Sequence, residues 1–301
     1  GENEKISCNG TAETGIDSWI GRGGIEEMYD CQLRGKDGWK IVEADASGNI
    51  LRELGIYPAQ NGGEIKLTID GWLQNAVAQA MAERKGAVVA LNPENGQILA
   101  LYSSPSFDPN KFSWERNDSL INQWLTDNQG MPFLNRAISA AYQPGSVFKI
   151  ISAVAGLESG QITAETVFED TGVIKIGEWE YRNWYWTDYG RTEGMVNLVK
   201  AIQRSNDIYF YKLGEKIGPE TIVGWADRFG VGKKSGIDLP GETEGLLPSP
   251  EWKKKVKGED WFLGNTYHLA IGQGDLEMTP LQVALMSAAV VNQGQICQPY
   301  L

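Results

Sequence analysis

The chain has 301 residues, 42% of them apolar and 22% charged, which is enough sequence for one large globular domain or two smaller ones. Its 27 basic and 39 acidic residues give a net charge of −12, which argues against nucleic acid as a partner because phosphate binding needs a basic face. Three cysteines are too few and too scattered for a disulfide framework or a zinc site, and a single histidine, His268, excludes a multi-histidine metal centre.

The first part of the chain is predicted to be a small β-rich module. Residues 1–20 are polar and rich in glycine, without clear periodicity. Period-two alternation then predicts short strands at 40–43, 49–52 and 64–69, punctuated by glycines.

A helix and an antiparallel hairpin come next. Asp70 is a good N-cap for a helix that is expected to end near residues 85–86. Residues 87–91 and 98–102 are predicted to pair around a turn that contains Asn-Gly. A helix followed by a hairpin indicates the α+β class rather than a doubly wound parallel sheet.

The stretch from Tyr142 to Lys149 carries the candidate nucleophile. A Pro-Gly pair breaks the chain before Ser146, and apolar residues then recur at helical spacing, so Ser146 is expected at a helix N-terminus with Lys149 on the same face. First-turn N–H groups favour negative charge near the serine oxygen, and a lysine kept neutral by burial can take its proton. A capping serine beside a solvated lysine is the plainer interpretation, because Ser-x-x-Lys alone is a weak signal.

The later elements are predicted from periodicity and capping signals. Residues 167–190 are β-rich and dense in aromatic side chains, for which cross-strand packing is favoured over a ligand groove. Helices are expected over 195–217, over 219–229 and from Thr279 to Val291. His268 lies in an apolar context and is expected to be a packed side chain rather than a base.

Ser205 and Asp207, inside the 195–217 segment, form a second candidate pair. A serine hydroxyl near a neutral lysine can pass a proton between nucleophile, lysine and leaving nitrogen. The side chain two residues on can bind a substrate amide or hold the lysine in place. Ser-x-Asp has almost no value as an isolated signal.

Together, these four residues resemble the active-site motifs of the penicillin-binding proteins and serine β-lactamases. Further segments match this family in the same order along the chain: 21–26, 33–35, 66–70, 86–104, 107–110, 134–137, 229–232, 236–242, 271–274 and 279–282. Asp207, where much of the wider family has asparagine, resembles the elongation-type (cell-shape) subgroup of the class B penicillin-binding proteins.

The resemblance implies a fold and an activity. It implies an α+β transpeptidase domain at 66–301, with an antiparallel sheet flanked by helices, and a β-rich pedestal fragment of the dimerisation type at 1–65. It implies a serine D,D-transpeptidase that cross-links peptidoglycan stem peptides through an acyl-enzyme and is a target of β-lactams. Ser146 would be the nucleophile and Lys149 the base, Ser205 would relay protons, and Asp207 would complete the catalytic set.

The family's third motif, Lys-Thr/Ser-Gly, is the main departure. Lys234-Ser235-Gly236 spells it, but in family register this stretch belongs to a loop, so it is interpreted as a decoy. The motif is expected beyond Leu301, which leaves the substrate-binding residues unassigned. The transpeptidase domain is therefore expected to be truncated at its C-terminus, and residues 1–301 alone are expected to acylate weakly or not at all.

Cofactor, location and partners also follow from the resemblance. No cofactor is expected, and no metal, because some subgroup members hold zinc with His, Cys and Asp between the first two motifs and this chain has neither His nor Cys there. The expected location is the extracytoplasmic face of the bacterial inner membrane, with the membrane anchor lost. The expected partners are a membrane glycosyltransferase and other wall-elongation proteins.

Two alternatives stay open. One keeps the acyl-enzyme and sends the acyl group to water, as in a D,D-carboxypeptidase, a serine β-lactamase or a β-lactam sensor. The other is a non-catalytic scaffold of the wall-elongation complex, which has no need of the serine and lysine residues.

Overall fold

A computed structural model describes residues 20–301 of the chain. It divides into two compact units, one that extends through Leu67 and includes Asp238–Pro240, and one made of Thr68–Ile237 with Gly241–Leu301. Within residues 20–301, no helix combines the length and the apolar character that a membrane crossing requires.

The first unit contains a long, exposed hairpin. Its strands are antiparallel, and the rings of Trp39 and Tyr57 stack across them with centroids 4.1 Å apart. Cys31, in the short helical stretch before the hairpin, is disulfide-bonded. The elements of this unit are α1 (Gly24–Met28), α2 (Asp30–Leu33), β1 (Trp39–Ala44) and β2 (Ile50–Tyr57).

Two of the three strands predicted in this part are confirmed, and the third is wrong. The alternating residues 64–69 form no strand. Two contacts join this region to a later strand, Ile98–Ser104. The Thr68 hydroxyl donates to Ile98 O at 2.6 Å, and Asp70 N donates to Leu99 O. The segment lacks the repeated backbone pairing that makes a ladder.

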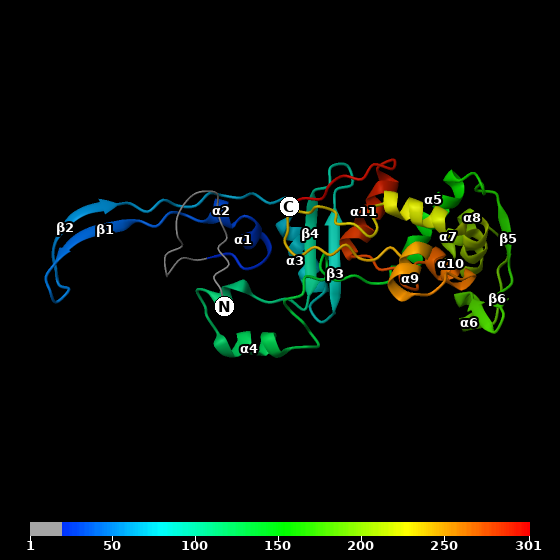
Figure 1. Cartoon of the computed structure of the whole chain (residues 1–301), viewed down its shortest axis with the longest axis horizontal. Coiled ribbons are helices and arrows are strands. Elements are labelled where there is room, and N and C mark those ends of the chain that lie inside the picture. Colours follow the sequence, from blue (N-terminus) through cyan, green and yellow to red (C-terminus); the bar gives the residue numbers. More distant parts are fainter. Residues whose placement is uncertain (1–19) are drawn as a thin grey trace. The chain divides into compact units, whose positions relative to one another are not determined.

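The second unit begins with a helix and a hairpin, as predicted, but the helix ends at Ala80 rather than near residues 85–86. Asp70 caps the helix by accepting a 2.9 Å hydrogen bond from Leu73 N. The hairpin is antiparallel, with α3 packed against β4 and α11 against β3 (Figure 1). The elements are α3 (Gly71–Ala80), β3 (Gly86–Leu91), β4 (Ile98–Ser104) and α11 (Pro280–Val291), and the connection from β4 carries η1 (Pro109–Phe112) and α4 (Asp118–Thr126).

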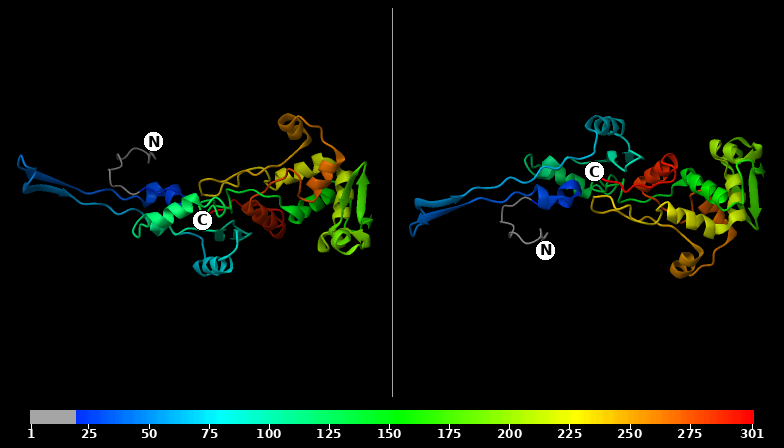
Figure 2. Two further views of the ribbon diagram at one scale, coloured as in Figure 1. Left: turned by 90° about the horizontal axis from the view of Figure 1, so that it is seen from below. Right: turned by 90° about the horizontal axis from the view of Figure 1, so that it is seen from above.

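The core of the second unit is a packed group of helices, which Figures 1 and 2 show at the end of the unit away from the β3–β4 hairpin. Phe148, Ile151 and Phe210 are completely buried there. Gly214 lets two helices approach closely, because a Cβ at this position would lie 3.0 Å from Ala270 Cβ. The helices are α5 (Lys149–Glu158), α8 (Asp207–Arg228) and α10 (Leu263–Ala270), with α9 (Pro250–Lys257) before α10.

The single helix predicted over 195–217 is wrong. The segment forms β8 (Gly194–Asn197) and α7 (Leu198–Gln203), and α8 then starts at Asp207. Asn197 and Asn206 each cap the helix that follows, and Ser205 adopts a φ of +50°, which ends α7. A second break at Gly218 (φ 77°) lets Pro219 restart the helix where one was predicted.

Residues 167–190 are β-rich as predicted, but the aromatic side chains are placed differently. Trp184, Tyr185 and Tyr189 lie on a short helix rather than across strands, so the prediction of cross-strand packing is wrong for them. The elements are β5 (Val167–Asp170), β6 (Val173–Ile176), β7 (Trp179–Arg182) and α6 (Trp184–Tyr189), with β5 paired to β8 and β6 to β7. Helices and antiparallel strand pairs together confirm the α+β prediction.

Candidate active site

The Ser146 stretch forms a short helical turn that leads directly into α5. Residues Gly145–Phe148 form the 3-10 turn η2, and α5 begins at Lys149. Ser146 is exposed, whereas Lys149 is only 2% exposed. The predicted position of Ser146 at a helix start is therefore confirmed, although its hydroxyl caps no helical N–H.

This turn is held by the segment that precedes α11. Gly145 N donates to Gly272 O at 2.8 Å, and the backbones of Tyr142 and Met278 exchange two hydrogen bonds of 2.8 and 2.9 Å. A Cβ at Gly272 would lie 2.2 Å from Gly145 O, and its φ is +75°. Only glycine fits this close approach, so Gly272 allows the turn that carries Ser146 to lie directly against the segment after α10.

The turn between α7 and α8 brings Ser205 to the same place. Its hydroxyl donates to Ser146 Oγ at 2.8 Å and accepts from Lys149 Nζ at 3.0 Å. Lys149 also donates to the Ser205 carbonyl oxygen at 2.8 Å. The structure therefore joins Lys149 to Ser146 through the Ser205 hydroxyl.

Asp207 supplies the charge beside the lysine. Lys149 Nζ lies 2.6 Å from Asp207 Oδ1, and Asp207 Oδ2 accepts from Trp184 N at 3.2 Å. Burial lowers the pKa of Lys149, and the Asp207 carboxylate raises it less than burial lowers it. The balance brings the amine closer to the neutral form that a base needs.

The side chains of Ser146, Ser205 and Lys149 form a path along which a proton can move from Ser146 to Lys149. With a neutral amine, the Ser205 hydroxyl can turn to donate to the nitrogen lone pair while the Ser146 hydroxyl donates to Ser205 Oγ. Proton transfer along this chain leaves a serine oxyanion at an exposed position and an ammonium beside Asp207. This is the arrangement of an activated nucleophile.

Lys234, the residue of the apparent third motif, lies in a loop and on no strand. The next two residues are bound by one carboxylate. Ser235 N donates to Glu242 Oε1 at 2.7 Å, and Gly236 N donates to Glu242 Oε2 at 3.1 Å. This geometry supports the decoy interpretation, which stays a prediction.

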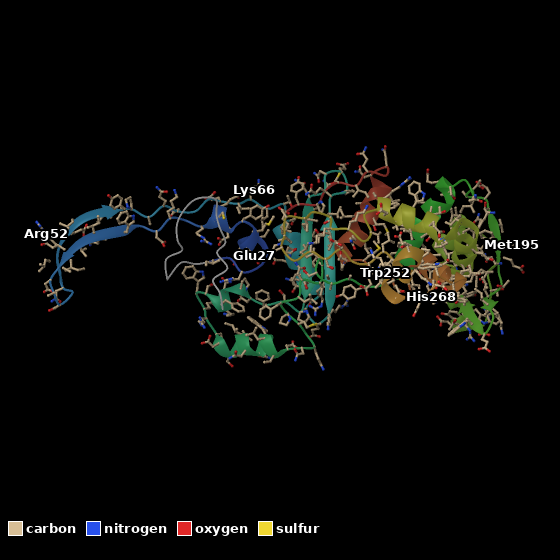
Figure 3. All side chains as sticks on the ribbon, viewed as in Figure 1. Glu27, Arg52, Lys66, Met195, Trp252 and His268 are labelled. Carbon is tan, nitrogen blue, oxygen red and sulfur yellow. The ribbon has the colours of Figure 1, made fainter. Side chains whose placement is uncertain are left out.

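His268 packs as expected rather than joining the site. It lies on α10 among the neighbouring side chains (Figure 3), with its ring 5.5 Å from that of Tyr181. Burial lowers the pKa of His268, which favours the neutral ring. Among residues 20–301, no three His, Cys, Asp or Glu side chains are grouped so that they could hold a metal ion. The absence of a metal site stays a prediction.

Several residues that support the site were not found from the sequence. Asp170, Asn183 and Asn206 form a buried polar group behind Ser205 and Asp207. Asn206 could have been recognised as an N-cap had α8 been started at residue 207. Asp170 ends β5 and Asn183 precedes α6, and neither residue carries a local signal.

The comparisons with known proteins agree with this geometry. The penicillin binding protein transpeptidase domain matches residues 86–301, and the penicillin-binding protein dimerisation domain matches residues 3–67. The chain belongs to the penicillin-binding protein transpeptidase family. Its curated relatives also confirm the resemblance to the elongation-type subgroup.

Two of these relatives are peptidoglycan D,D-transpeptidases named MrdA. The chain is 40% identical over 284 residues to that of Acinetobacter baumannii, covering 94% of the chain and 42% of the relative. It is 35% identical over 284 residues to that of Escherichia coli strain K12, covering 94% of the chain and 44% of the relative. The chain thus spans less than half the length of these two relatives.

Solved structures give the same family. The penicillin-binding protein PBP2 of Helicobacter pylori, in a complex with MreC, has a TM-score of 0.81 at 33% identity, covering 93% of this chain and 51% of that chain. Pseudomonas aeruginosa PBP2 in complex with WCK 5153 has a TM-score of 0.77 at 37% identity, covering 94% of this chain and 59% of that chain. These matches confirm the predicted transpeptidase-domain fold.

Proposed function

We propose that the protein is a D,D-transpeptidase that cross-links peptidoglycan through a serine acyl-enzyme. The observation that carries this proposal is the hydrogen-bonded chain from buried Lys149 through Ser205 to exposed Ser146. The names of the relatives give the reaction class. Peptidoglycan stem peptides are the proposed substrates, and β-lactams are the proposed inhibitors.

Acylation is the first step. Ser146 Oγ attacks the carbonyl carbon between two terminal D-alanines, and its proton passes through Ser205 to Lys149. In this family the third motif, Lys-Thr/Ser-Gly, lies on a strand beside the nucleophile. The Ser146 N–H and a donor from that strand stabilise the oxyanion. The carbon–nitrogen bond then breaks, and the proton returns through Ser205 to the departing amine.

Cross-linking is the second step. An amine of a neighbouring stem peptide attacks the acyl carbon and gives its proton to the Ser205–Lys149 pair. The bond from carbon to Ser146 Oγ then breaks, and the proton returns to the serine. Asp207 stays an acceptor throughout, so that the ammonium form of Lys149 is stabilised whenever it carries the transferred proton.

Acylation by benzylpenicillin tests the proposal. We expect intact-protein mass spectrometry of the full-length protein to find one penicilloyl adduct, and Ser146→Ala to abolish it. Ser287→Ala removes an exposed serine from α11 and is the matched control, which should acylate like the parent. No adduct on the parent, or an adduct that survives Ser146→Ala, would contradict the proposal.

The lifetime of the adduct separates the transpeptidase from its closest alternatives. A transpeptidase shields the acyl carbon from water, so its penicilloyl adduct should persist after excess drug is removed. Turnover within seconds would instead favour a β-lactamase. Release of D-alanine from a stem peptide without an acceptor amine would favour a carboxypeptidase.

The domain division and the setting of the protein belong to the same proposal. We assign residues 1–65 to a pedestal and 66–301 to the transpeptidase domain, and the unit boundary at Leu67 supports this assignment.

The proposed location is the extracytoplasmic side of the inner membrane, which the disulfide at Cys31 supports because disulfides persist in oxidising compartments. The proposed partners are a membrane glycosyltransferase and wall-elongation proteins, as the MreC complex of the Helicobacter pylori relative suggests.

A further inference from the structure

A buried carboxylate behind the proposed catalytic residues accepts hydrogen bonds from four separate connections between helices and strands. Asp170, at the end of β5, is 3% exposed, and no lysine or arginine among residues 20–301 forms an ion pair with it. It accepts four hydrogen bonds, from Gly172 N at 2.8 Å, Asn183 Nδ2 at 3.0 Å, Glu193 N at 3.0 Å and Asn206 Nδ2 at 2.9 Å. Four donors offset the cost of burying the charge, and they fix the positions of the loops that supply them.

Two of these donors, Asn183 and Asn206, connect Asp170 to the pair Ser205 and Asp207. Asn206 lies between Ser205 and Asp207, is completely buried, and also caps α8 by accepting from Tyr209 N at 2.9 Å. Asn183, also completely buried, accepts from Asp207 N at 3.2 Å through its Oδ1. Asp170 therefore controls Asp207 from two directions, through the neighbouring residue and through the Asn183 amide.

The backbone of Ser205 needs such support. Its φ of +50° is in the left-handed region, which is unfavourable for a non-glycine residue and persists only where the surroundings enforce it. Asn206 and Asn183 each donate a side-chain hydrogen bond to Asp170, and Asp207 N donates to Asn183. These bonds hold the residues that follow Ser205. They keep the Ser205 hydroxyl between Ser146 and Lys149.

We infer that Asp170 is a positioning residue for the acyl transfer, acting through Asn183 and Asn206 to hold Ser205 and Asp207 in place. This inference rests on the proposed function, since it assigns a role within the same site. Asp170 touches none of the reacting groups. Its loss should therefore slow the chemical step and leave the first, non-covalent binding of the β-lactam nearly unchanged.

Asp170→Asn in the full-length protein is the test variant. In either orientation of the new side-chain amide, its NH2 group faces an N–H group that had donated a hydrogen bond to the carboxylate. We expect the acylation rate constant for a fluorescent penicillin to fall about 10- to 100-fold, since small misplacements of catalytic groups have effects of this size. The dissociation constant of the non-covalent complex should stay within about threefold of the parent, a factor worth less than 1 kcal/mol.

A rescue variant separates positioning from a general loss of stability. Asn206→Asp alone places two carboxylates together and should also slow acylation. Combined with Asp170→Asn it restores one donor–acceptor pair and retains the cap on α8, while Asn183 Nδ2 and Glu193 N still face the new NH2 group. The double variant should therefore recover part of the lost rate and acylate faster than either single variant. Asp30→Asn removes a carboxylate of similar burial (5% exposed) from the first unit and should leave acylation unchanged.

Amide hydrogen exchange gives a readout that does not depend on the reaction. Asp170→Asn should speed exchange at the Asp207 amide, which donates to Asn183, and leave the amides of α5 protected. If the parent protein is not acylated, the proposed function fails, and the exchange result still decides the positioning role. Normal acylation with unchanged exchange, or no recovery in the double variant, would overturn the inference.

Discussion

Lys149 Nζ lies 2.6 Å from Asp207 Oδ1, and the lysine is withdrawn from solvent on the helix start beside Ser146. Two opposing effects meet at this contact. Burial disfavours the charged amine, and the carboxylate favours it. Burial is the larger effect, so the pKa of Lys149 lies below its ordinary value while the amine still has an anionic partner once it takes a proton.

Asp207→Asn should shift the pH dependence of acylation to lower pH. Asparagine keeps an oxygen for Lys149 but removes the charge that raises its pKa, so more of the amine is neutral at a given pH. We expect the acid limb of the second-order acylation rate to move down the pH scale. The matched control is Asp227→Asn, which removes an exposed carboxylate paired with Lys233 and should leave the profile in place. A shift to higher pH would contradict the argument.

Lys149 should also make the folded state more stable as pH rises. Its pKa is lowered on folding, so between that lowered value and 10.5 the unfolded chain binds more protons, and the free energy of unfolding increases with pH. Lys149→Met should remove this increase and be relatively more stable at the acid end. Urea unfolding of both proteins at a series of pH values measures the difference. The ionisation of Tyr209, whose pKa burial raises to about 12, is common to both proteins and cancels.

Two substitutions at Ser205 should separate the effect of its hydroxyl on the acylation rate from the effect of its strained backbone on stability. Ser205→Ala and Ser205→Gly both break the link between Lys149 and Ser146, and each should lower the acylation rate about 100- to 10,000-fold, the usual size of a proton-transfer effect. Glycine tolerates the positive φ of this position and alanine does not. Thermal unfolding should therefore find Ser205→Gly the more stable of the two. Comparable acylation by either variant and the parent would show that the relay is not used.

Local signals predicted the parts of the site that are close in sequence. The Pro-Gly break and helical spacing placed Ser146 and Lys149 correctly, because a helix start depends on a few neighbouring residues. They failed at the 195–217 segment, where helical periodicity continues through a break that Ser205 and Asn206 make. That break depends on Asp170 and Asn183, which periodicity within the segment cannot reveal. Ordered family motifs recovered the pairing of Ser205 with Lys149, which no local rule supplied.

Lys234→Ala should leave acylation unchanged. Lys234 is exposed in a loop, and the residues after it are held by Glu242 rather than by a strand. Substitutions at such surface positions change the free energy of unfolding by about 0.5 kcal/mol or less. An activation free energy that shifted by as much would change the rate only about twofold. The acylation rate of the variant with a fluorescent penicillin checks this. A loss of tenfold or more, which is well above that range, would identify Lys234 as part of the third motif after all.

Gly272→Ala should damage the site through the loop that carries Ser146. The added Cβ would lie 2.2 Å from Gly145 O and 2.7 Å from Phe148 Cβ, so the turn that carries Ser146 must shift. Gly294→Ala is the matched control, because its φ of +87° is similarly unfavourable but nothing lies within 4 Å of the new atom. The control should lose about 1–2 kcal/mol of unfolding free energy from the backbone effect alone. Gly272→Ala should lose more and acylate more slowly at temperatures where both proteins are folded. Equal losses in the two variants, with normal acylation, would mean that the loop tolerates the displacement and that Gly272 does not set the position of Ser146.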